Sequence, residues 1–151
     1  MPKIVFKNDE ISYTSEVKFL AINISYNLKW NTHIRFLCSK LNKVSYMILS
    51  LRGDLSLFML RSIYFTKFQS LIRYAIILWC GERESVKVLQ IQKRVLQSNK
   101  WLHKRQSCRP IFKELKVLMV TSLHGIRLYN KMPIRIKHVS ITNLMHNFFI
   151  P

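Results

Sequence analysis

A row of basic residues in the second half of the chain has the spacing of a phosphate-binding helix. Lys87 and Arg94 are seven residues apart, as are Lys93 and Lys100, so each pair shares one face of a helix. Such cations can track the phosphates of a nucleic acid along a groove, and an aromatic ring among them can stack on a base. The predicted nucleic-acid-binding row consists of Lys87, Lys93, Arg94, Lys100, Trp101, Lys104, Arg105 and Arg109. A buried anchor role for Trp101 and a merely solvated face for the cations are the alternative interpretations.

The net charge of the chain favours a polyanionic partner. The sequence has 151 residues, with 25 Lys+Arg against 7 Asp+Glu, which gives a formal charge of +18. Residues 1–60 hold 8 basic and 4 acidic residues, whereas residues 61–151 hold 17 basic and 3 acidic ones. We therefore expect a nucleic acid as the first partner and an anionic membrane surface as the second, contacted mainly by the second half.

The same shortage of acidic residues argues against catalysis by this chain. Phosphoryl transfer with two metal ions needs clustered carboxylates, and seven scattered acids do not provide them. His103 and Cys108 could be two zinc ligands, but no second pair completes a site. His33, close to Trp30 at a predicted helix start, is interpreted as a packing or capping residue. We predict no catalytic residue, metal ligand or cofactor in this chain.

Cysteine usage and hydropathy indicate where the chain resides. The 3 cysteines are odd in number and widely spaced, which predicts an intracellular compartment, nucleus or cytoplasm, rather than a disulfide framework. The N-terminus has no apolar signal region. The most apolar stretch, residues 74–81, is far shorter than the ~20 residues that span a bilayer, so we expect no transmembrane segment.

The hydrophobic pattern predicts a mainly α fold with a small N-terminal β-element (α+β) and three parts. Residues 1–25 are predicted as a β-hairpin or strand element, residues 26–131 as a helical bundle and residues 132–151 as a poorly defined tail. Within the first part, residues 4–6 and 11–14 are expected to pair across a turn, and residues 17–24 to form one covered strand.

Apolar residues with helical spacing predict at least four helices in the second part. Asn31 or Thr32 is expected to cap a helix that ends near residues 52–53, and Ser56 to cap a helix that runs to residues 80–81. The apolar residues of the first helix are predicted to share one face: Ile34, Leu37, Cys38, Leu41, Val44 and Ile48. The second helix is predicted to bury one stripe: Leu57, Leu60, Tyr64, Phe68, Leu71 and Ala75. A third helix, from about Ser85, is predicted to bury Val88, Ile91, Gln92 and Val95, with Leu89 and Leu96 at its flank. A short helix over 111–117 and a helix or strand over 123–129 follow.

Six stretches, in order, resemble blocks at the C-terminal end of reverse transcriptases from Jockey-type non-LTR retrotransposons. Residues 17–22 (V-K-F-L-A-I) resemble the family's V-K-F-L-G-V strand, and residues 28–34 (L-K-W-N-T-H-I) its L-x-W-x-x-H-I. The other four are residues 60–64 (L-R-S-I-Y) followed by 73–79 (R-Y-A-I-I-L-W), 89–95 (L-Q-I-Q-K-R-V), 107–115 (S-C-R-P-I-F-K-E-L) and 125–137 (G-I-R-L-Y-N-K-M-P-I-R-I-K).

The resemblance implies a template-primer-gripping part of an RNA-directed DNA polymerase. In that family the first block ends the palm beside the primer terminus, and the following helices form the thumb. It therefore adds Lys18 to the predicted nucleic-acid-binding residues, and it implies RNA or an RNA/DNA duplex and a palm-containing reverse transcriptase segment as partners. Mg²⁺ is expected only for that palm, because the family's Y-A-D-D carboxylates lie upstream.

Two departures from the family pattern shape the prediction. Ala21 stands where the family usually has glycine, and Gly125 follows Leu123 where several tens of residues usually intervene. We therefore expect a thumb-like remnant of a mobile-element reverse transcriptase, a fragment without the polymerase active site. The alternatives are a non-functional transposon relic, a subunit that complements a separate palm, and a basic helical protein on an anionic membrane surface.

Overall fold

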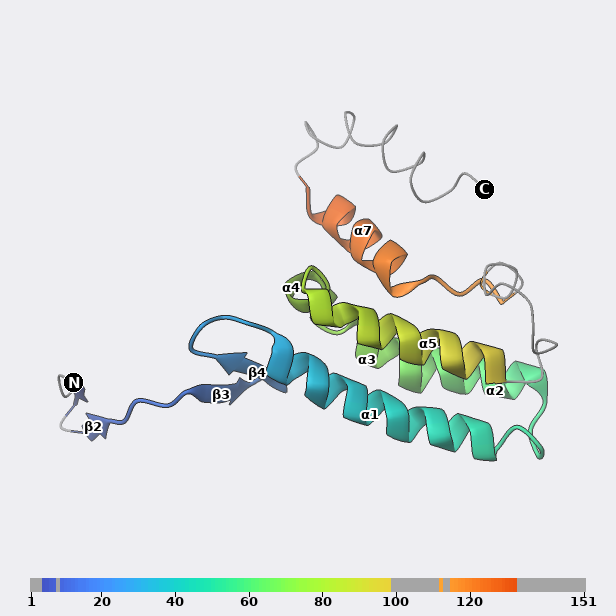
Figure 1. Ribbon diagram of the computed structural model, residues 1–151, viewed down its shortest axis with the longest axis horizontal. Helices are drawn as coiled ribbons and strands as arrows, with labels where there is room; N and C mark the ends of the chain where they lie inside the picture. The colour runs from blue at the N-terminus through green and yellow to red at the C-terminus, as the bar shows by residue number, and fades with distance from the viewer. Residues whose placement is uncertain (1–3, 8, 99–111, 113–114, 133–151) are drawn as a thin grey trace.

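The fold is mainly α with a small N-terminal β-element, as predicted (Figure 1). The computed structural model describes residues 4–7, 9–98, 112 and 115–132. The predicted tail therefore lies outside the described residues apart from Met132, as do residues 111, 113 and 114 of the predicted short helix over 111–117. Of the described residues in that range, Phe112 is helical and residues 115–117 are not. Helices occupy the described chain from Asn31 to Lys131, and the strands precede them.

Two antiparallel hairpins precede the helices. β1 (Ile4–Phe6) pairs with β2 (Asp9–Ile11), and β3 (Glu16–Phe19) pairs with β4 (Ile22–Ser25). The prediction of one covered strand over residues 17–24 is wrong. The chain reverses at Leu20 and Ala21, which have φ angles of 45° and 61°. Two positive φ angles in a two-residue loop are the requirement of a type I′ turn, which Asn-Gly normally satisfies, so the Leu-Ala sequence gave no turn signal.

Helix α1 (Asn31–Ser50) presents its buried face as the sequence predicts. Ile34, Leu37, Leu41 and Ile48 are buried at helical spacing. The predicted cap is wrong, since Trp30 occupies the N-cap position and no side chain caps the helix. Thr32 Oγ1 instead donates a hydrogen bond to Glu16 Oε1 at 2.7 Å, which ties the first turn to β3.

The predicted second helix is interrupted twice. Ser56 caps α2 (Leu57–Ile63) as predicted, accepting from the Met59 backbone N–H at 3.4 Å. A π-helix, η1 (Tyr64–Gln69), and α3 (Ser70–Arg73) continue it, and left-handed Ala75 (φ 52°) separates them from α4 (Ile76–Trp79).

The π-helix changes which residues form the buried stripe of this segment. A π-helical turn holds more residues than an α-helical turn, so buried positions lie further apart in the sequence. The predicted stripe is correct at Leu60, Tyr64 and Phe68, but it continues to Ile72 and Ile76 instead of Leu71 and Ala75, and Leu57 is exposed. Leu71 and Ala75 are half-buried at its side.

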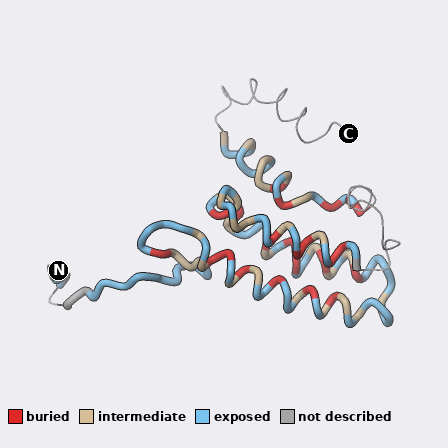
Figure 2. The backbone as a smooth tube through the Cα atoms, viewed as in Figure 1, coloured by how far each residue is buried: buried red, intermediate tan, exposed pale blue. Residues whose placement is uncertain are grey.

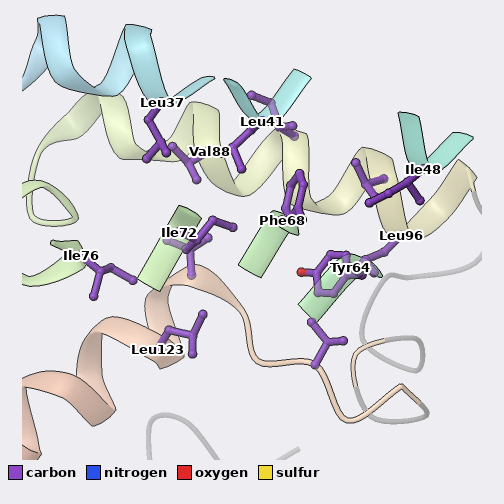
Figure 3. Close-up of a cluster of buried hydrophobic side chains, with 14 of the residues drawn as sticks. Leu37, Leu41, Ile48, Tyr64, Phe68, Ile72, Ile76, Val88, Leu96 and Leu123 are labelled. Carbon is purple, nitrogen blue, oxygen red and sulfur yellow. The ribbon is translucent and has the colours of Figure 1, made fainter. Parts of the chain in front are cut away.

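The remaining helices close the core. A short 3₁₀ turn, η2 (Arg83–Ser85), leads into α5 (Val86–Ser98), and α7 (Val120–Lys131) resolves the ambiguous prediction over 123–129 as helix. α5 packs between α1 and α7 and in front of α2 and α3 (Figure 1). The buried residues line the inner faces of these helices (Figure 2), and side chains from α1, α5, α7 and the segment 60–76 meet in one cluster (Figure 3).

One polar side chain is fully buried in this cluster with its hydrogen bonds satisfied. Gln92 Nε2 donates to Tyr64 Oη and to the Leu118 carbonyl oxygen, both at 2.9 Å. Gln92 Oε1 accepts from the Val120 backbone N–H at 3.1 Å. A buried amide that is paired on both sides stabilises a unique arrangement, here of η1, α5 and the start of α7.

Candidate nucleic-acid interface

The outer face of α5 carries two of the predicted phosphate-binding residues. Val88, Ile91, Gln92, Val95 and Leu96 face the core, and Leu96 is fully buried although the sequence placed it at the flank. Lys87 and Arg94, two turns apart, are exposed on the opposite side, where Gln90 and Gln97 are also exposed. The outer face of α5, defined by Lys87, Gln90, Arg94 and Gln97, is therefore polar and cationic over most of the helix.

An acidic neighbour moderates the charge at one end of this face. Lys87 Nζ forms an ion pair with a carboxylate oxygen of Glu84, three residues earlier in η2. Both side chains are substantially exposed, so the pair contributes little to folding stability. A phosphate can compete with Glu84 for the ammonium group, because an exposed ion pair is weak and solvated.

Lys93 does not belong to the outer face of α5. Its side chain is half-buried at the flank of the helix, next in sequence to fully buried Gln92. Lys93 and Arg94 thus point to different sides, as adjacent helical positions must. Its predicted partner Lys100 lies outside the described residues, together with Trp101, Lys104, Arg105 and Arg109.

Lys18 lies on β3, away from the α5 row. Its Nζ is 5.5 Å from the centroid of the Phe36 ring on α1, and Lys40 Nζ is 4.5 Å from the same centroid. Phe36 and Lys40 are not among the predicted nucleic-acid-binding residues. A signal for them was present, because residues 36 and 40 are one helical turn apart and lie off the predicted apolar face.

Another cation in the second half of the chain has a structural role. Arg61 Nε donates a hydrogen bond to the Leu115 carbonyl oxygen at 3.1 Å, and its guanidinium carbon is 5.3 Å from the Phe65 ring centroid. Arg61 is half-buried on α2, and its hydrogen bond ties the segment before α7 to that helix. Part of the high positive charge of residues 61–151 therefore serves contacts within the fold.

His33 packs inside the fold, as the sequence predicts. It is buried, its ring lies edge-on to Trp30 at 6.3 Å, and its Nδ1 accepts from the Asn23 backbone N–H at 3.4 Å. Burial, and then repulsion by Lys40, lower the pKa of His33 below its usual 6.5. A neutral imidazole is what the hydrogen bond at Nδ1 requires.

Burial makes the two described cysteines packing residues and not reactive thiols. Cys38 and Cys80 are half-buried free thiols beside the core. Burial raises the pKa of Cys38, an effect that nearby Lys87 opposes and Glu84 reinforces, and burial raises the pKa of Cys80 to about 11. Thiols with raised pKa values hold little thiolate at neutral pH and are poor nucleophiles. Within residues 4–7, 9–98, 112 and 115–132, no group of three His, Cys, Asp or Glu could hold a metal ion.

Comparison with protein-family models, with curated proteins and with solved structures finds no match to this chain. In the part of the chain that the structure describes, no helix is both long and apolar enough to cross a membrane.

Proposed function

We propose that the chain is a nucleic-acid-binding module that grips RNA or an RNA/DNA duplex through its phosphates. The outer face of α5 is the observation that carries this proposal: Lys87 and Arg94 project from one side of a helix whose other side is anchored in the core. A rigid helix with cations two turns apart contacts phosphates without reading bases, so the binding has little sequence preference. The net charge of +18 adds a long-range attraction to polyanions.

The resemblance to Jockey-type reverse transcriptases supports a more specific form of the proposal. The chain then corresponds to the thumb of an RNA-directed DNA polymerase from a mobile element, which holds the template-primer duplex. Polymerisation itself, and the Mg²⁺ that it requires, belong in this proposal to a separate palm segment.

The proposal is tested by the salt dependence of binding to a blunt RNA/DNA duplex. We expect affinity to fall steeply with salt, and the double variant Lys87→Gln/Arg94→Gln to reduce the slope of log K against log[salt] by about 2, one unit per phosphate contact. The matched control is Arg127→Gln/Lys131→Gln, which removes the same charge from exposed positions on α7. An equal effect of both pairs, or no binding at low salt, would refute the assignment of the α5 face.

A palm-bearing partner is a second candidate because the β3–β4 hairpin is incomplete as a sheet. Both strands are edges, and Val17 and Phe19 on β3 are more than half exposed. A two-stranded hairpin with exposed apolar side chains is marginal in water, and an added strand would cover it. Mixing the chain with a thumb-deleted reverse transcriptase should then increase primer extension, and unchanged extension would exclude this partner.

Membrane-surface binding is favoured by a different feature. Leu57, Phe58 and Met59 at the start of α2 are consecutive, apolar and at least half exposed. Apolar side chains near basic residues can insert into an anionic bilayer surface. Flotation with anionic vesicles, compared with neutral vesicles, measures this function. Phe58→Ser should weaken binding to anionic vesicles and leave nucleic-acid binding unchanged, which separates the two functions.

A further inference from the structure

Two lysines from different elements converge on one aromatic ring at the junction of the β3–β4 hairpin with α1. Lys18 Nζ lies 5.5 Å and Lys40 Nζ 4.5 Å from the centroid of Phe36. Both lysines are exposed and the ring is half-exposed. The Phe36 cluster, defined as Lys18, Phe36 and Lys40, thus presents an aromatic surface and two ammonium groups to solvent.

Phe36 does not lie on the core-facing side of α1. The buried face of α1 is formed by Ile34, Leu37 and Leu41, whereas Phe36 lies on another side of the helix. Lys40 and Lys43 lie one and two helical turns after Phe36 on the same side of α1, and both are exposed. Packing into the core therefore does not explain an aromatic residue at this position.

The hairpin is held so that Lys18 reaches the ring. On β3, Glu16 Oε1 accepts from Thr32 Oγ1 at 2.7 Å, and on β4 the Asn23 backbone N–H donates to His33 Nδ1 at 3.4 Å. Lys18 is paired with Asn23 in the register of the two strands. Bonds from both strands to the first turn of α1 fix the side of the hairpin from which Lys18 extends. The Phe36 cluster is therefore built by tertiary contacts rather than by one flexible segment.

We propose that the Phe36 cluster is a stacking site for an unpaired nucleotide, which deepens and rests on the proposed nucleic-acid binding. The base stacks on Phe36, and Lys18 and Lys40 contact the flanking phosphates. Exposed cation–π contacts are weaker than the stacking of a base on an aromatic ring, so the ammonium groups can leave the ring for phosphate oxygens. Phenylalanine has no hydrogen-bonding group, so the site does not distinguish one base from another. Bases within a duplex are already stacked, and the site therefore selects single-stranded segments.

The test compares a blunt RNA duplex with the same duplex carrying a single-stranded extension, each titrated into the full chain by fluorescence anisotropy. We expect the wild-type chain to bind the extended duplex more tightly. Phe36→Leu keeps an apolar side chain but removes the ring, and it should weaken binding of the extended duplex about tenfold while leaving the blunt duplex unchanged. Its salt slope should be unchanged, because no charge is lost.

Variants of Lys18 and Lys40 test the proposed phosphate contacts separately from the stacking. Lys18→Gln/Lys40→Gln should reduce the salt slope for a single-stranded oligonucleotide by about 1.4, since each phosphate contact on a single strand contributes about 0.7. Phe36→Trp should retain the preference for the extension and show more quenching of indole fluorescence on binding than the wild-type chain, which has 3 tryptophans of its own. Phe58→Leu, at an exposed phenylalanine on α2, is the matched control and should change neither affinity.

The outcomes separate this inference from the function on which it rests. Binding of both duplexes with equal affinity, or an equal loss on both in Phe36→Leu, overturns the stacking site and leaves the α5 face intact. Failure of the wild-type chain to bind either duplex at low salt overturns both. Circular dichroism of each variant shows whether a loss of affinity reflects unfolding, and retained binding by Phe36→Trp shows that position 36 tolerates substitution.

Discussion

Gln92 Nε2 donates a hydrogen bond to Tyr64 Oη at 2.9 Å inside the helical core. The two residues lie on α5 and on the π-helix, 28 positions apart. Gln92 also bonds the backbone of Leu118 and Val120, so one amide joins three segments of the bundle. The helix that carries the proposed phosphate contacts is therefore aligned by a buried polar link as well as by apolar packing.

Replacing Gln92 by leucine should destabilise the fold strongly. Gln92→Leu keeps the volume but leaves the Tyr64 hydroxyl, the Leu118 carbonyl and the Val120 N–H without their partner, and we expect a loss of about 2–4 kcal/mol. Urea unfolding followed by circular dichroism measures the change. Gln90→Leu on the exposed face of the same helix is the control and should stay within about 0.5 kcal/mol. Equal effects at both positions would contradict the role given to the hydrogen bonds.

The fold should lose stability in alkaline solution. Burial holds the pKa of Tyr64 well above its usual 10, although the hydrogen bond from Gln92 acts in the opposite direction, and burial raises the pKa of Cys80 from 9.0 to about 11. Because the folded-state pKa values are raised, the stabilisation is complete below pH 9 and is lost as the pH rises above it. Melting temperatures between pH 8 and pH 11 should show the fall.

The two groups are separated by variants. Cys80→Ala should reduce the part of the alkaline fall that begins near pH 9, to which Cys38 also contributes, and Tyr64→Phe should remove the part that begins near pH 10. Tyr64→Phe also loses the bond to Gln92 and should be less stable by about 1 kcal/mol at neutral pH. A pH profile that both variants leave unchanged would mean that other groups control the transition.

Acid should loosen the contact between the β3–β4 hairpin and α1. The pKa of His33 is lowered, so its stabilisation is present above pH 6.5 and is lost as the pH falls below that value. Protonation also removes Nδ1 as the acceptor for the Asn23 N–H. An NMR titration of the His33 ring should give a midpoint below 6.5, and protection of the Asn23 amide from exchange should fall in parallel. A midpoint at or above 6.5 would contradict the buried, neutral imidazole.

The turn of the β3–β4 hairpin should be improved by glycine. Ala21 has a φ of 61°, a conformation that costs an L-residue about 1 kcal/mol or more. Ala21→Gly removes that cost but gains entropy in the unfolded state, so we expect stabilisation of up to about 1 kcal/mol. Ala21→Val, with a β-branched side chain, should be destabilising instead. Amide exchange over residues 22–25 reports both changes, and equal protection in the two variants would contradict the left-handed turn.

Local periodicity predicted the helices better than the breaks between them. The buried faces of α1 and α5 follow from apolar residues spaced at 3.6 positions, and Ser56 follows from its capping chemistry. Leu96 was misplaced because α5 contacts α1 on one side and α7 on another, which widens its buried arc beyond one face. The π-helix and the left-handed Ala75 have no local signal, since no glycine or proline lies within residues 64–75.

The candidate binding residues could likewise be predicted where one helix carries them, and could not be predicted where tertiary contacts bring them together. Lys87 and Arg94 could be predicted to share a face because both lie on one helix. The convergence of Lys18 with Lys40 on Phe36 could not, because it depends on the turn at residues 20–21 that brings β3 back against α1. A prediction that treats residues 17–24 as one strand cannot place Lys18 beside a helix.

The tip of the β3–β4 hairpin is also bonded to a distant residue. The Tyr74 hydroxyl at the end of α3 donates to the Leu20 carbonyl oxygen at 2.5 Å, across 54 positions of sequence. During synthesis, which proceeds from the N-terminus, the hairpin emerges long before Tyr74. The tip of this hairpin therefore gains its bond to Tyr74 only after α1, α2 and the π-helix have been synthesised. Until α3 leaves the ribosome, the position of the hairpin depends on the bonds that its two strands make to the first turn of α1.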